Sequence, residues 1–124
     1  LLAEAPHRPP PLRELAAAVA APEVALRRAC KGYARAGLIV EVAPDRFFLR
    51  EAVLEMAGIA HALSAELPEG FSAAQFRDRT GSGRQLAIGV LDYLDRRGIT
   101  VRRGDLRRAG RDPAAVFGGA VPGG

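Results

Sequence analysis

The stretch FRDRTGSGRQLAIGVLDYLDRRGITVRRGD (residues 76–105) decides the fold. Its glycine-rich turn at residues 80–83 precedes apolar residues at helical spacing, namely Leu86, Ala87, Val90, Leu91 and Leu94. Gly98 is a typical residue just beyond a helix, and Arg96 and Arg97 suit the negative end of the helix dipole. A short strand and a Gly-Asp turn come next. The order helix, tight turn, helix, strand, turn predicts a winged helix-turn-helix, whose second helix usually faces nucleic acid.

A similar pattern lies upstream. An apolar helical face begins at Leu12, Pro22 fits the first position of a second helix, and Gly37 ends that helix. Residues 38–42 and 47–49 then read as a hairpin around a Pro-Asp turn. The predicted fold class is therefore mainly α with small β-hairpins, arranged as tandem winged helix-turn-helix domains. The predicted divisions are a linker or fragment end (1–11), a winged helix (12–50), a second winged helix (51–108) and a flexible tail anchored at most through Phe117 (109–124).

Basic charge gathers in the C-terminal half of the chain. Residues 1–70 hold 8 Lys and Arg against 9 Asp and Glu, a net charge of −1, whereas residues 71–124 hold 10 Arg against 5 Asp, a net charge of +5. The planar guanidinium of arginine suits phosphate groups and base edges better than an ammonium group does. A polyanionic partner is therefore expected for the second module.

Residues 76–105, with their Phe-Arg-Asp, glycine-flanked turn and Arg-rich wing, resemble the last winged-helix module of the bacterial selenocysteine-specific translation elongation factor. The segment LRELAAAVAAPEVALRRACKGYARAGLIVEVAPDRFFLRE (residues 12–51) is similar to the penultimate winged helix of that family. The resemblance implies binding of the messenger-RNA hairpin that recodes a UGA codon. It also implies that the whole protein binds GTP, selenocysteinyl-tRNA and the ribosome. Gln85 stands where the family usually has Lys, and Val101 where it often has Arg, so a gentler salt dependence is expected.

The candidate RNA contacts form a basic corner. The first turn of the second helix offers free N–H groups, which attract phosphate, and the wing adds exposed arginines. With the resemblance, these considerations predict an RNA-binding site made of Ser82, Gly83, Arg84, Gln85, Arg102, Arg103, Arg77, Arg79 and Arg107, with Arg108 nearby. Either Ser82 or Gly83 is expected to cap the helix. Because A-form RNA hides its bases, the corner is expected to read splayed loop or bulge bases.

Other readings stay open at this point. The chain could be a DNA-binding winged-helix regulator or a scaffold whose basic face meets an acidic protein. A face with Arg27, Arg28, Lys31 and Arg35 is either a second nucleic-acid surface or a solvated helix side balanced by acids. No nucleotide-binding loop, catalytic group or metal-ligand spacing is found, so neither enzyme activity nor a cofactor is expected of this fragment. Without a signal peptide or long apolar run, we expect a cytoplasmic monomer with no membrane contact.

Overall fold

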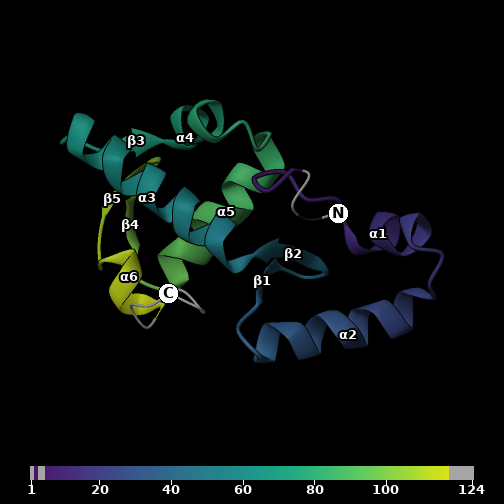
Figure 1. Cartoon of the computed structure of the whole chain (residues 1–124). Helices are drawn as coiled ribbons and strands as arrows, with labels where there is room; N and C mark the ends of the chain where they lie inside the picture. Colours follow the sequence, from purple (N-terminus) through teal and green to yellow (C-terminus); the bar gives the residue numbers. More distant parts are fainter. Residues whose placement is uncertain (1, 3–4, 118–124) are drawn as a thin grey trace.

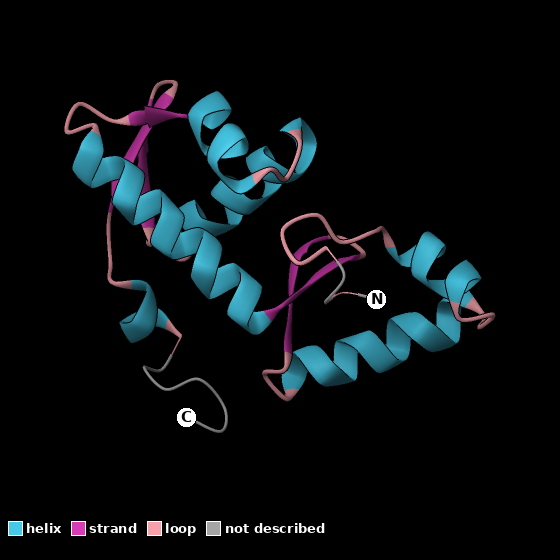
Figure 2. Cartoon of the chain, turned by 45° about the horizontal axis from the view of Figure 1, so that its top comes forward, coloured by secondary structure: helices cyan, strands magenta, loops and turns pink. Residues whose placement is uncertain are grey.

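The computed structural model describes residue 2 and residues 5–117. In chain order the elements are α1 (Leu12–Ala18), α2 (Glu23–Arg35), β1 (Ile39–Ala43), β2 (Arg46–Leu49), α3 (Arg50–Glu66), β3 (Phe71–Ser72), α4 (Ala73–Thr80), α5 (Arg84–Arg96), β4 (Thr100–Arg103), β5 (Leu106–Ala109) and α6 (Pro113–Val116). Figure 1 shows their arrangement, and Figure 2 shows that helices dominate around two small sheets. The predicted fold class is thus confirmed. None of the described helices is both long and apolar enough to cross a membrane.

The elements from α3 to β5 form one winged helix. Its antiparallel sheet has the order β3-β5-β4, and α3, α4 and α5 pack around it. The apolar face predicted for α5 lies in the core, with Leu86 at the margin. Gly98, at φ 75°, ends the helix and lets the Ile99 N–H donate to the Leu94 carbonyl over 2.9 Å. The core also contains side chains from α3 and the chain around α4, namely Val53, Met56, Ala57, Ala60, Leu63, Phe71 and Phe76.

The first module has the predicted pair of helices followed by a hairpin. β1 and β2 are antiparallel, with Ile39 opposite Leu49 and Val40 opposite Phe48. The turn between them puts Asp45 at φ 59°, in the left-handed region that Asp tolerates better than most residues. The core of this module is small and consists of Leu12, Cys30, Ile39 and Phe47. Cys30 is buried in this core, with only 7% of the residue exposed.

The β1-β2 hairpin belongs to both modules. Successive side chains of a strand point to opposite faces, so Phe47 joins the small first core while Phe48 joins the large core of the second module. Val42 of β1 lies in that large core too. β2 ends at Leu49 and α3 begins at Arg50, with no linker between them. The two modules therefore pack as one unit around a shared hairpin (Figure 1).

The described part of the predicted linker, residue 2 and residues 5–11, is packed against the body. The imidazole Nδ1 of His7 lies 3.2 Å from the Thr80 carbonyl oxygen, and its Nε2 lies 2.9 Å from a Glu55 carboxylate oxygen. Pro9 is buried, and its carbonyl accepts a hydrogen bond from Arg46 of β2 over 3.0 Å. This differs from a free linker, because histidine and proline fix the segment between the two modules.

The segment predicted as a flexible tail is also ordered as far as Phe117. β5 continues to Ala109, and the N–H groups of Gly110 and Arg111 donate to backbone carbonyls over 2.7 Å. After α6, the Phe117 ring lies 5.6 Å from the Arg50 guanidinium carbon and 5.8 Å from that of Arg97. The expected contact of Phe117 is thus confirmed, and residues 118–124 lie outside the described part.

Candidate nucleic-acid interface

Two local motifs define the two ends of α4. Ser72 and Gln75 form a capping box at the start of α4, in which the Gln75 N–H donates to Ser72 Oγ over 3.1 Å and the Ser72 N–H to Gln75 Oε1 over 2.7 Å. At the other end, Gly81 has φ 70° and Gly83 has φ 82°. Residues other than glycine rarely adopt such positive φ angles. The turn predicted from the sequence therefore joins the two helices tightly.

Gly83, and not Ser82, occupies the N-cap position of α5. The Ser82 residue is only 1% exposed, and its hydroxyl lies 2.8 Å from the hydroxyl of Thr80. This hydroxyl pair holds the turn together and removes the Ser82 side chain from the surface. Since α5 has no side-chain cap, its first N–H groups carry the partial positive charge of an open helix terminus.

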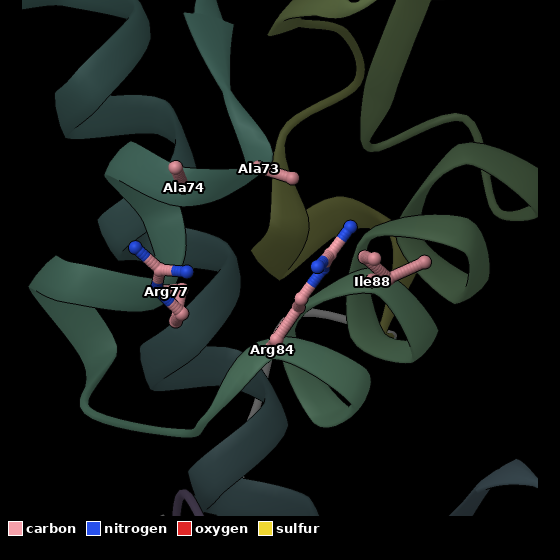
Figure 3. Close-up of a pocket in the computed structure, with 5 residues that line it drawn as sticks. All are labelled: Ala73, Ala74, Arg77, Arg84 and Ile88. Atoms are coloured by element: carbon pink, nitrogen blue, oxygen red, sulfur yellow. The ribbon is translucent and has the colours of Figure 1, made fainter.

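A groove of about 240 Å³ lies between α4 and α5. Arg77 and Arg84 extend toward it from α4 and α5, as Figure 3 shows, and Ile88 lies one turn after Arg84. Ala73 and Ala74 complete an apolar lining. An apolar surface bordered by two guanidinium groups can take the face of a nucleobase and the phosphate beside it. Sequence analysis missed Ile88, although its spacing of four from Arg84 places both on one face of α5.

Arg79 lies on the opposite flank of α4 from this groove. Its guanidinium makes two hydrogen bonds of 2.9 Å to the carboxylate of Glu66 at the end of α3. These hydrogen bonds, aided by the charge of Arg79, lower the pKa of Glu66 below its ordinary value. The neighbouring surface also carries Asp78. Arg79 therefore belongs to an acidic flank of α4, in contrast to its predicted place in the RNA corner.

Arg107 differs most from its predicted position. It is only 3% exposed, and its guanidinium reaches back to α5, where Nε lies 3.0 Å from one Asp95 oxygen and a terminal nitrogen lies 3.0 Å from Asp92. Thr100 of β4 donates a further hydrogen bond to Asp95. Arg107 thus ties the wing to α5 and offsets part of the charge of two carboxylates, and its side chain is buried instead of lying at the predicted RNA surface.

The wing keeps its other arginines at the surface. Arg102, Arg103 and Arg108 are exposed, and Arg102 Nε donates to the Gly104 carbonyl over 2.8 Å at the hairpin tip. Leu106, beside that tip, pairs in register with Ser72, the residue before α4. The wing tip therefore lies next to the end of α4 that lines the groove. Of the predicted residues, Arg77, Gly83, Arg84 and Gln85 line the groove or the adjoining start of α5, and Arg102 and Arg103 lie in the wing strand β4.

Two of the four basic residues on this face of α2 are paired with acids. Arg27 makes two hydrogen bonds to the carboxylate of Asp45, over 2.9 and 2.8 Å, and these raise the pKa of Arg27 and lower that of Asp45. Lys31 pairs with Glu41. Arg28 and Arg35 are exposed. The solvated-side interpretation fits Arg27 and Lys31.

Among residue 2 and residues 5–117, no group of three or more acidic, His or Cys side chains could hold a metal ion.

Comparison with known proteins adds a family to this geometry. A family model described as "Elongation factor SelB, winged helix" matches residues 62–109. The chain is 38% identical over 94 residues to the selenocysteine-specific elongation factor of Escherichia coli (strain K12), and 33% identical over 72 residues to that of Desulfomicrobium baculatum. These matches cover 76% and 58% of this chain but only 15% and 11% of the relatives.

A solved structure agrees with these matches. It is described as the mRNA-binding domain of elongation factor SelB from E. coli in complex with SECIS RNA, and it superposes with a TM-score of 0.79 at 35% sequence identity. The likeness covers 85% of this chain and 86% of that chain. The chain therefore belongs to the family of SelB, the selenocysteine-specific elongation factor.

Proposed function

We propose that this chain is the messenger-RNA-binding part of a selenocysteine-specific elongation factor and that it recognises a selenocysteine-insertion hairpin. The observation that carries the proposal is the groove between α4 and α5, where Arg77 and Arg84 border an apolar surface. The likeness to a SelB domain solved with SECIS RNA supports RNA as the ligand. In the whole protein, a GTPase region outside this chain would bind GTP and selenocysteinyl-tRNA. This chain, a monomer in the cytoplasm, would bring them to the ribosome at a UGA codon.

The size of the groove favours a hairpin tip over a long duplex. About 240 Å³ is room for one or two splayed groups, not for a helix. In A-form RNA, sequence-specific readers bind loop or bulge bases that have left the stack. We therefore assign one unstacked base to the apolar surface at Ile88 and a flanking phosphate to Arg84. The exposed arginines of the wing contact phosphates of the stem.

Arg84→Ala is expected to weaken hairpin binding by roughly 1–3 kcal/mol, the scale of a well-placed arginine contact to a nucleic acid. The side chain is exposed and makes no ion pair with another described residue, so the melting temperature should stay close to that of the parent. Fluorescence anisotropy with a labelled hairpin measures the affinity. Arg35→Ala, at an exposed arginine on α2, is the matched control and should bind like the parent. A large drop in melting temperature with unchanged affinity of the folded fraction would make Arg84 a structural residue.

A salt titration tests whether the groove reads bases or only charge. Counterion release should give the hairpin and a fully paired RNA similar slopes, of roughly 0.7–0.9 per phosphate contact. Salt screens base contacts little. At every salt concentration the hairpin should therefore bind more tightly than the paired RNA, by about 3 kcal/mol or more of binding free energy. A hairpin with changed loop bases should follow the duplex. Three superimposed curves would contradict base recognition, and tighter binding of a DNA duplex would favour a DNA-binding regulator.

A further inference from the structure

A second pocket lies at the start of α5, beside the groove. Its volume is about 310 Å³, and its lining joins three distant parts of the chain. The N-terminal segment contributes Arg8, the shared hairpin contributes Arg46, and the first turn of α5 contributes Arg84 and Gln85. Arg84 borders both this pocket and the groove. A strand of RNA that crosses the first turn of α5 would therefore pass over both.

The N-terminal segment fixes Arg8 in this place. His7 before it is held at Thr80 and Glu55, and Pro9 after it is buried and hydrogen-bonded to Arg46. Between these anchors the Arg8 guanidinium lies against the turn, since a Cβ placed on Gly83 would be 3.7 Å from it. A longer side chain in place of Gly83 would compete for this space. The guanidinium is thus brought to the pocket by anchored neighbours on both sides, through the imidazole of His7 and the carbonyl of Pro9.

Among the described residues, no carboxylate balances the charges of the pocket. No acidic residue lines it, and within the described part of the chain none of its three arginines makes an ion pair with a carboxylate. Elsewhere on the surface Arg27, Arg77 and Arg79 each have a carboxylate partner. Like charges gathered around one cavity repel one another unless an anion lies between them. Guanidinium groups bind phosphate oxygens through paired, charge-assisted hydrogen bonds.

We infer that Arg8, Arg46 and Arg84 together bind one phosphodiester of the RNA backbone, next to the nucleotide held in the groove. This inference rests on the proposed function, because it places the phosphate on the same RNA hairpin. It adds the N-terminal segment and the first module's hairpin to an interface otherwise made by the second module. The first module then contributes to affinity directly, and not only as a spacer.

The test compares Arg8→Gln with Arg35→Gln in the full chain, by fluorescence anisotropy with the labelled hairpin. Both changes remove one positive charge from an exposed arginine, so non-specific charge effects are matched. We expect Arg8→Gln to weaken binding about tenfold and to lower the salt slope by about one contact. Arg35→Gln should bind like the parent. Arg8→Lys should recover only part of the loss, because an ammonium group cannot make paired hydrogen bonds.

Each outcome separates this inference from the proposed function. If Arg8→Gln binds like Arg35→Gln while Arg84→Ala is weakened, the phosphate site is overturned and the groove stands. If both glutamine variants lose affinity equally, long-range charge explains the loss and the site is again overturned. If the parent chain binds the hairpin no better than a paired RNA, the proposed function fails and the inference falls with it.

Discussion

Phe48→Ala is expected to lower the free energy of unfolding by about 3–5 kcal/mol, the usual cost of removing a buried phenylalanine ring. The ring is fully buried and lies in the core that α3, α4 and α5 also form. Its loss leaves a cavity at the junction of β2 with that core, so the winged helix from α3 to β5 should lose stability although Phe48 lies outside it. Urea unfolding followed by circular dichroism measures the change, and hydrogen exchange locates it.

Phe47→Ala is the matched control, one residue away on the same strand. Phe47 is equally buried but packs with Leu12, Cys30 and Ile39 of the small core. Exchange should therefore accelerate first in α1 and α2 of this variant, and in α3 to β5 of the Phe48 variant. If Phe48→Ala left the exchange of α3 to β5 unchanged, the two modules would be independent domains and the shared core would be wrong.

The sequence predicts well what depends on local spacing. The apolar face of α5 and the glycine after it lie within a few helical turns of each other, so propensity and periodicity suffice to place them. The local pattern of residues 47–49 likewise predicts a strand for Phe47 and Phe48. Which of the two rings serves which module depends on packing between segments, and strand alternation alone does not state it.

The rest of the site depends on contacts between distant segments. A proline-rich beginning reads as irregular chain, yet His7 and Pro9 are fixed by residues of α3, α4 and β2. Nothing near Arg8 in the sequence indicates its place beside Gly83. Likewise, the sequence gives an arginine in the wing but not the strand register that turns it inward or outward. Arg107 is buried and its neighbour Arg108 is exposed, and only the pairing of β5 with β3 and β4 determines which of the two side chains points inward.

Arg107→Ala is expected to lower the free energy of unfolding, while the folded fraction keeps its affinity for the hairpin. The side chain of Arg107 is only 4% exposed between Asp92 and Asp95, whose side chains are 45% and 21% exposed. Removal of the guanidinium leaves two carboxylates close together and partly desolvated on α5. Breaking a buried pair in this way costs 3–5 kcal/mol, and the exposure of Asp92 puts the expected loss near the lower limit, at about 3 kcal/mol. Arg108→Ala, at the exposed neighbour, should change the unfolding free energy by less than about 0.5 kcal/mol.

A rescue experiment separates charge from packing at this position. In an Arg107→Leu background, Asp92→Asn and Asp95→Asn remove the uncompensated charges, so part of the lost stability should return; replacing a buried ion pair with neutral groups is often tolerated. The measurements are urea unfolding and hairpin titration corrected for the folded fraction. The opposite pattern would be unchanged unfolding of Arg107→Ala with a loss of affinity as large as that of Arg84→Ala. That result would show that Arg107 contacts the RNA and that its inward position is wrong. The inward position instead explains how α5 carries Asp92 and Asp95 near the proposed RNA groove. Arg107 pairs with both carboxylates and offsets part of their negative charge, which lowers the repulsion toward phosphates near Arg84 and the wing.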